Sequence, residues 1–116
     1  RESGYMATRW LLSHPRRPTA IYSVNDMMAI GAMDAIREAG LEIPRDIALF
    51  GGDDILLAQY VKPQLSTIRQ NMYLIGQLAC ERLFALVEGK PYEGLTEVEL
   101  ELVIRESCGA AQRSAS

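Results

Sequence analysis

Two groups of polar residues in this 116-residue chain directly follow apolar runs, where their side chains could hold a ligand. The pair Asn25-Asp26 follows the apolar run at 19–24, and the sequence GGDD at 51–54 follows the next apolar run. The amide of asparagine both donates and accepts hydrogen bonds, whereas an ionised aspartate only accepts them. Together these groups could hold neighbouring hydroxyl groups of a polyol or a sugar.

Each group also has a purely structural interpretation. Asparagine and aspartate are favoured as N-cap residues because they accept backbone N–H groups of the first helical turn, so either could cap a helix beginning near Met27. The two roles can be divided, with Asp26 as the cap and Asn25 facing a ligand. The GGDD sequence at 51–54 could be a tight turn, since glycine tolerates conformations that other residues avoid.

The sequence gives little support for catalysis or metal binding. His14 is the only histidine, and no second histidine or cysteine stands at metal-ligand spacing, which argues against a metal site or a Ser-His pair. Asp53 and Asp54 are adjacent, so at a strand end their side chains point apart rather than converge on a substrate. Residues 51–54 also lack the lysine and the glycine spacing of a phosphate loop. We therefore expect no enzymatic activity, no metal and no cofactor.

The elements that must position these residues alternate between helix and strand. Apolar residues at helical spacing predict helices at 4–12, 27–39 and 72–87. Short apolar runs predict strands at 19–24, 46–50 and 66–70, and an alternating pattern predicts an edge strand with one wet face at 98–105. Gly40 stands where a left-handed helix cap belongs. Strand, helix and strand joined by a short link predict a parallel pair, and hence an α/β fold. Gln70 would add an amide at the same rim of the sheet.

Composition and charge limit the classes of protein. Hydrophobic residues at 48% and charged residues at 23% are typical of a globular domain. A net charge of −3 argues against a phosphate-binding surface on this chain. No apolar stretch reaches the roughly 18 residues that span a bilayer, and the first ten residues lack the layout of a signal peptide. Cys80 and Cys108 fall in different predicted elements, so free thiols and a reducing cytoplasm are expected.

Several ordered motifs resemble one family of bacterial transcription regulators. The segments PTAIYSVNDMMAIGAMDAIREAGLEIPRDIALFGGDD, PQLSTIRQNMYLIGQLACERLFALVEG and ELVIRES are similar to the effector-binding core of the lactose- and galactose-repressor family. The resemblance implies a fold like that of periplasmic sugar-binding proteins, with two α/β lobes around a ligand cleft. It implies that residues 1–108 are the C-terminal part of an effector-binding and dimerisation domain, largely its second lobe, and that 109–116 are a flexible tail.

The resemblance also implies roles for individual residues. Asn25 and Asp53 stand where the family holds ligand hydroxyls, and Gln70 and Met72 stand where it places cleft contacts near the crossing between lobes. The family dimerises through the second lobe, and its contact surface corresponds to Ile30, Met33, Ile55, Leu56 and Tyr60. A bulky residue is usual where Gly52 stands, which implies a more open wall beside Asp53 in this chain.

Further parts of such a regulator are expected upstream of Arg1. They are the DNA-reading helix-turn-helix, the hinge, most of the first lobe, and the first strand of the second lobe with its ligand-binding arginine. Operator DNA would be bound through that N-terminal domain and not by this chain. The chain would be cytoplasmic and homodimeric, would bind a sugar or metabolite, and would contact no membrane. Helix 72–88 matches an element of the first lobe, so its apolar face is expected to bury against its own sheet or another chain.

Two other functions fit the same residues. A periplasmic sugar-binding protein of a membrane transporter shares the fold and much of the cleft chemistry. A dimerisation module without a ligand would have the same apolar contact surface but no use for the polar rim.

Overall fold

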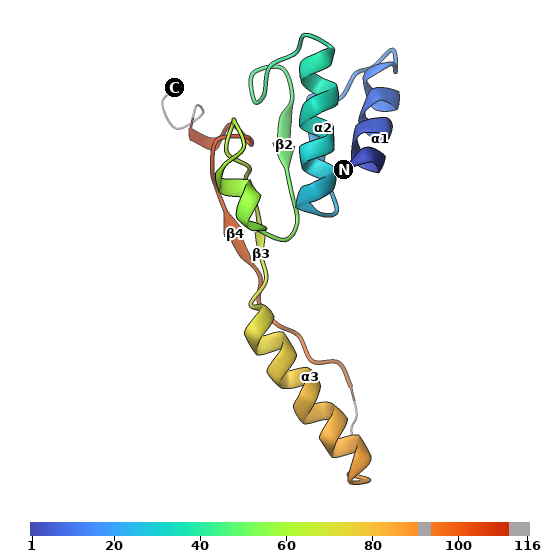
Figure 1. Cartoon of the computed structure of the whole chain (residues 1–116), viewed down its shortest axis with the longest axis vertical. Coiled ribbons are helices and arrows are strands. Elements are labelled where there is room, and N and C mark those ends of the chain that lie inside the picture. Colours follow the sequence, from blue (N-terminus) through green and yellow to red (C-terminus); the bar gives the residue numbers. More distant parts are fainter. Residues whose placement is uncertain (91–93, 112–116) are drawn as a thin grey trace. The chain divides into compact units, whose positions relative to one another are not determined.

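The computed structural model describes residues 1–90 and 94–111, which form two compact units (Figure 1). Unit 1 comprises Arg1–Arg69 and Leu102–Ser116, and unit 2 comprises Gln70–Glu101. Unit 1 contains α1 (Glu2–Leu12), β1 (Ala20–Tyr22), α2 (Asp26–Glu38), β2 (Ala48–Phe50), the 3-10 helix η1 (Leu56–Gln59) and β3 (Thr67–Arg69). Unit 2 contains α3 (Met72–Val87), and β4 (Glu101–Val103) leads from unit 2 back into unit 1.

β1 and β2 of unit 1 pair in parallel, as the sequence predicts. β1 pairs with β2, with Ala20 opposite Ala48 and Tyr22 opposite Phe50. A further parallel bridge joins Phe50 to Ser66, immediately before β3. Because parallel strands end at the same edge, the residues that follow β1 and β2 meet there. β3 and β4 form a second, two-stranded sheet.

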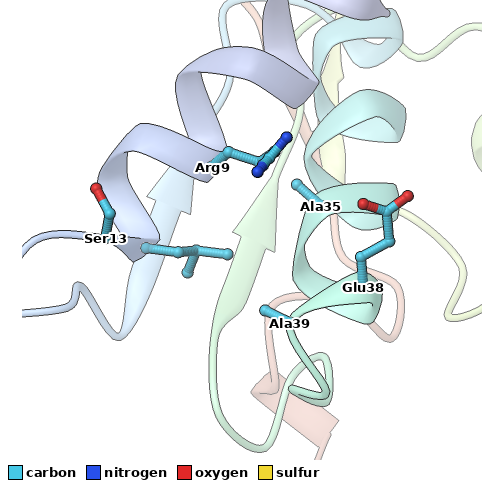
Figure 2. A pocket seen from close by; sticks show the side chains of 6 residues that line it. Arg9, Ser13, Ala35, Glu38 and Ala39 are labelled. Carbon is cyan, nitrogen blue, oxygen red and sulfur yellow. The ribbon is translucent and has the colours of Figure 1, made fainter.

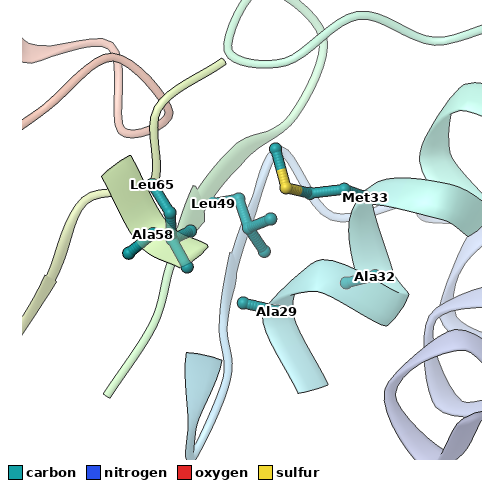
Figure 3. Packing of buried hydrophobic residues seen from close by; sticks show 6 residues of the cluster. All are labelled: Ala29, Ala32, Met33, Leu49, Ala58 and Leu65. Atoms are coloured by element: carbon teal, nitrogen blue, oxygen red, sulfur yellow. The ribbon is translucent and has the colours of Figure 1, made fainter. Parts of the chain in front are cut away.

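The core of unit 1 lies between α2 and β2 and continues to η1. Three small or flexible α2 side chains, Ala29, Ala32 and Met33, pack with Leu49 of β2, and Ala58 and Leu65 complete the buried cluster. Figure 3 shows Leu49 between the α2 side chains and the pair Ala58 and Leu65. Burying the larger side chains Met33, Leu49 and Leu65 is worth about 1.5–3 kcal/mol each, so this cluster fixes α2 against the strands.

Two glycines allow α1 and α2 to cross at backbone contact. A Cβ atom added at Gly4 would lie 2.1 Å from the carbonyl oxygen of Met28, and one added at Gly31 would lie 1.9 Å from that of Arg1. Two polar contacts between exposed side chains also join the helices. The guanidinium of Arg1 contacts Asp34 at 2.8 Å, and the Tyr5 hydroxyl donates to Glu38. Figure 1 shows these two helices side by side.

The predicted edge strand at 98–105 is mostly wrong. Only Glu101–Val103 form a strand, and Leu100, Leu102 and Ile104 are exposed rather than packed. The apolar residues of the alternating pattern do not face the interior. Arg105 reaches the interior of unit 1 instead, because it pairs with Asp54 there. Alternation identifies the two faces of a strand, but the pairing partners decide which face is covered.

The α3 helix has the predicted bounds, Met72–Val87, and Gly89 follows it with φ +72° as a left-handed cap. Pro91, which could not continue this helix, lies outside the described residues. No residue of α3 is buried, so the expected burial of its apolar face against its own sheet is not found. The described residues of unit 2 contain this helix and no sheet layer to cover it.

The ends of the chain and its cysteines complete the description. Cys80 and Cys108 are free thiols, as predicted. Gly109 donates its N–H to the carbonyl of Glu106 at 3.3 Å and is half-buried, while residues 112–116 of the expected tail lie outside the described residues. Within residues 1–90 and 94–111, no helix has both the length and the apolar character needed to cross a membrane.

The glycine crossing predicts a specific sensitivity to small side chains. Gly4→Ala or Gly31→Ala should lower the free energy of unfolding by about 1–3 kcal/mol, because the added methyl group forces the helix backbones apart. Gly76→Ala is the matched control, since nothing lies within 4 Å of a Cβ at that helical position. Urea unfolding of the variants measures the difference. Equal stabilities for Gly4→Ala, Gly31→Ala and Gly76→Ala would contradict the crossing.

Candidate functional site

The carboxylate of Asp26 is fully buried at the N-terminus of α2 and holds the loop that follows β2. Its Oδ1 accepts the N–H of Gly52 at 2.8 Å and the hydroxyl of Thr67 at 2.6 Å, and its Oδ2 accepts the N–H of Ile55 at 2.9 Å. A buried carboxylate is costly unless its oxygens are hydrogen-bonded, and here both oxygens are. The loop at 51–55 is therefore bound to the start of α2, and it is called the ligand loop below because the resemblance implies a ligand contact at Asp53.

Asp53 returns a hydrogen bond to the same point. Its Oδ1 accepts the backbone N–H of Asp26 at 2.8 Å, and its own N–H donates to the Thr67 hydroxyl at 3.2 Å. The Asp53 side chain is otherwise exposed, so a dissolved small molecule can reach it. Partial burial raises the pKa of Asp53, and the neighbouring carboxylates of Asp26 and Asp54 raise it further, although the Asp26 N–H favours the ionised form. A nearby hydroxyl donor would favour the ionised form in the same way.

Asn25, and not Asp26, is the N-cap of α2. The Oδ1 of Asn25 accepts the N–H of Met28 at 2.8 Å, and Asn25 is half-buried. Of the two N-caps that the sequence allows, Asn25 is confirmed; the alternative with Asp26 as the cap is wrong, because Asp26 binds Gly52, Ile55 and Thr67 instead. The cap uses the amide oxygen of Asn25, which leaves its NH₂ group as the donor for a ligand.

The glycines of the ligand loop are required by close approach. A Cβ at Gly51 would lie 2.1 Å from Oδ1 of Asp26, and one at Gly52 would lie 2.3 Å from the carbonyl oxygen of Val24. Gly52 and Asp53 form a bend, but neither Gly51 nor Gly52 has a positive φ, so close packing and not unusual backbone conformation accounts for these glycines. The more open wall expected at Gly52 is not found, because Gly52 is buried against the end of β1.

The other two predicted effector contacts belong to unit 2. Gln70 directly follows β3 and is half-buried, and its carbonyl accepts the N–H of Met72 at 3.0 Å. Met72 is the first residue of α3 and is exposed. Asn71 between them is the N-cap of α3, because its side chain accepts the N–H of Leu74 at 3.0 Å.

The predicted dimer contacts divide into exposed and buried residues. Leu56 and Tyr60 are 69% and 68% exposed, and Ile55 is half-buried. Ile30 is buried, and Met33 lies within the core cluster. A side chain inside the core cannot reach a second chain. Met33 therefore packs within unit 1 and does not itself contact a partner.

Two cavities of the described residues lie away from this rim, and a third lies on β1 and β2, with Tyr22 and Phe50 among its lining residues. One of about 390 Å³ lies between α1 and α2 and is lined by Arg9, Leu12, Ser13, Ala35, Glu38 and Ala39 (Figure 2). It is at the end of α2 opposite to Asn25. Among the residues that the structure describes, no group of three or more histidine, cysteine, aspartate or glutamate side chains could hold a metal ion.

Comparison with known proteins identifies the family. Residues 1–108 match the model of the periplasmic binding protein-like domain. The lactose operon repressor of Rhizobium radiobacter is 43% identical over 106 residues, which cover 91% of this chain and 94% of that protein. The chain belongs to the lactose- and galactose-repressor family. The ribose operon repressor of Haemophilus influenzae is 42% identical over 108 residues, which cover 91% of this chain and 32% of that repressor.

Solved structures of this family have the same fold. The Lac repressor dimer bound to operator and the anti-inducer ONPF aligns with a TM-score of 0.84 and 37% identity, over 92% of this chain and 32% of that one. The chain therefore spans about a third of the length of the ribose repressor and of the Lac repressor that it matches. The α/β architecture expected from the sequence is confirmed as the periplasmic-binding-protein-like fold of repressors in this family.

The hydrogen bonds of Asp26 predict that replacing one oxygen atom of its carboxylate lowers the stability of the fold. Asp26→Asn replaces an acceptor oxygen by an NH₂ group that opposes backbone N–H donors, so the free energy of unfolding should fall by about 1–3 kcal/mol. Asp34→Asn on the same helix removes a partly exposed ion pair with Arg1 and should change stability by less than about 1 kcal/mol. Thermal unfolding of both variants measures the difference. Indistinguishable midpoints would contradict the central role of the Asp26 carboxylate.

Proposed function

We propose that this chain is the effector-binding and dimerisation part of a bacterial repressor that responds to a sugar or small metabolite. One observation carries the proposal: the exposed carboxylate of Asp53 is hydrogen-bonded to the N-terminus of the helix that Asn25 caps. An amide donor and an ionised acceptor thereby meet at the carboxyl ends of β1 and β2. Open parallel sheets bind ligands at this edge.

The chemistry of the pair suits hydroxyl groups. The oxygens of Asp53 accept hydrogen bonds from ligand O–H groups, and the NH₂ group of Asn25 donates to ligand oxygens. A backbone that is already held by Asp26 and Thr67 loses little freedom when a ligand binds, which favours affinity. Gln70 and Met72 are proposed as further contacts from the segment that follows β3.

The proposal extends to the whole regulator. Residues 1–108 would be the C-terminal part of the effector-binding domain, with helix 72–88 belonging to its other lobe. Operator DNA would be bound by a separate N-terminal domain, in agreement with the operator-bound Lac repressor among the structural relatives. A protein with this role works in the cytoplasm. The relatives named above are repressors, which favours this function over that of a periplasmic transport protein and over an enzyme.

Dimerisation is proposed through η1 and the residues beside it. Leu56 of η1 and Tyr60 at its C-terminal end are both exposed, and Ile55 directly precedes them; Ile30 of α2 is proposed as part of the same surface. Contiguous exposed apolar side chains of this kind favour a protein contact. The solved Lac repressor that aligns with this chain is itself a dimer.

Sugar binding gives the direct test of the proposed function. Calorimetric titration of the protein with D-ribose, lactose and galactose should find at least one that binds. Asn25→Ser keeps a helix cap but removes the NH₂ donor, and Asp53→Ala removes the acceptor. Each should weaken binding of that sugar by about tenfold or more, because a hydrogen bond to a ligand hydroxyl is lost.

The control for these variants is Asn71→Ser, which makes the same exchange at the cap of α3. It should retain sugar affinity closer to that of the wild type. Unchanged affinity in both Asn25→Ser and Asp53→Ala would remove these residues from the site, and binding of no sugar or other small metabolite would refute the proposed function.

The dimer surface is tested by light scattering. Leu56→Glu or Tyr60→Glu should weaken self-association by at least about tenfold, because a charge replaces buried apolar area. Trp10→Glu is the matched control, since Trp10 is equally exposed at 68% but belongs to α1. A wild type that is monomeric at micromolar concentration, or an equal loss in all three variants, would contradict this surface.

A further inference from the structure

The carboxylate of Asp54 joins the ligand loop to both strands by which the chain leaves and re-enters unit 1. Its Oδ2 accepts Nε of Arg69 at 2.8 Å, and its Oδ1 accepts Nη2 of Arg105 at 2.8 Å. Arg69 is the last residue of β3, and Arg105 follows shortly after β4. One side chain of the ligand loop is therefore bound to both connections at once.

This contact is largely shielded from water. The side chain of Asp54 is 8% exposed and that of Arg105 is 12% exposed, whereas that of Arg69 is 47% exposed. Arg105 also donates to the carbonyl of Leu65 at 2.9 Å, and its backbone N–H donates to Oγ of Ser66 at 2.8 Å. An ion pair held by several hydrogen bonds in a poorly solvated place resists separation, so it transmits displacement rather than absorbing it.

The charges within this contact are fixed at neutral pH. Burial raises the pKa of Asp54, but the hydrogen bonds and positive charges of Arg69 and Arg105 outweigh it, and the pKa lies below its ordinary value. Asp53, one residue earlier, has its pKa shifted in the opposite direction. The two neighbouring carboxylates therefore have different surroundings. Asp54 is bound by two arginines, whereas Asp53 is exposed.

The backbone binds Asp53 and Asp54 to the same side chain, that of Thr67. Asp54 has φ +51°, a left-handed conformation that is uncommon outside glycine and that its surroundings must maintain. The N–H groups of Asp53 and Asp54 both donate to the hydroxyl of Thr67, at 3.2 Å and 3.3 Å. A shift of Asp53 toward a bound ligand therefore changes the position of the Asp54 carboxylate.

We propose that Asp54 is a positioning residue that transmits occupancy of the sugar site to β3 and β4 through Arg69 and Arg105. The inference rests on the proposed function, because it concerns how a repressor reports its ligand. Asp53 holds the ligand, while the Asp54 carboxylate is engaged by the two arginines and takes no part in holding it. The signal is a coupled movement of two strand ends that lie close together in space and far apart in the sequence.

The test separates binding from response in the full-length protein. Affinity for D-ribose, lactose and galactose is measured by calorimetry, and affinity for the promoter DNA of its own operon is measured with and without saturating sugar. In Asp54→Asn the sugar affinity should stay within about threefold of the wild type. The factor by which sugar changes DNA affinity, commonly about 5–150-fold in coupled systems, should fall below about threefold.

Two further variants decide the interpretation. Arg69→Gln removes only the more exposed arginine and should also reduce the response, which keeps the test usable if Asp54→Asn does not fold. Asp46→Asn is the matched control, because Asp46 also pairs with an arginine, but it precedes β2 instead of following it. It should respond like the wild type.

The outcomes are distinct. A full response in both Asp54→Asn and Arg69→Gln, or an equal loss in Asp46→Asn, would overturn the role of Asp54 and leave the proposed function intact. Loss of sugar binding in Asp54→Asn and Arg69→Gln would place these residues in the site itself and also overturn the inference. A wild type whose DNA affinity no sugar changes would overturn both the inference and the sugar-responsive function.

Discussion

The buried carboxylate of Asp26 is the interaction on which the rest of unit 1 depends. It is bound by Gly52 and Ile55 from the ligand loop and by Thr67 from β3, so one residue at the start of α2 joins three segments that are distant in sequence. A charge buried without water must have its oxygens satisfied, and only a loop with glycine at 51 can come close enough to do so. The position of Asp53, and with it the chemistry of the rim, follows from this requirement.

Much of the fold could be predicted because its signals are local. The helix Met72–Val87, the left-handed Gly40 and the parallel pairing of β1 with β2 follow from apolar spacing, glycine and a short connection. The roles of Asn25 and Asp26 could not be assigned, because both residues are good N-caps and the choice is made by Thr67, 41 residues away from Asp26. Thr67 itself carries no sequence signal beyond a β-branched residue in a strand. The prediction of which residues near β4 face inward was wrong for the same reason, because Arg105 turns inward to pair with the distant Asp54.

Two consecutive aspartates in the ligand loop have identical side chains, but their positions give them different surroundings and opposite shifts of pKa. Asp53 is left exposed with a raised pKa, and Asp54 is enclosed by arginines with a lowered pKa. The difference arises from backbone geometry, because the left-handed conformation of Asp54 turns its carboxylate toward β3 and β4 while Asp53 stays at the edge of the sheet. The same loop can thus meet a ligand on one side and the strand ends on the other.

Unit 1 is built from two separate stretches of chain, and this affects how it can fold as it is made. The central strand β2 is completed by Ser107, whose carbonyl accepts the Leu49 N–H at 2.9 Å and whose hydroxyl donates to the Leu49 carbonyl at 2.7 Å. Ser107 leaves the ribosome 58 residues after Leu49, with all of unit 2 between them. Until then Ser66 already accepts the Gly51 N–H on this side of β2, but the Leu49 N–H and carbonyl lack their partner and can pair with other chains. The final folding step of unit 1 therefore waits until Ser107 has been made, and a chain that ends within unit 2 would keep the Leu49 position of β2 open to pairing with other chains.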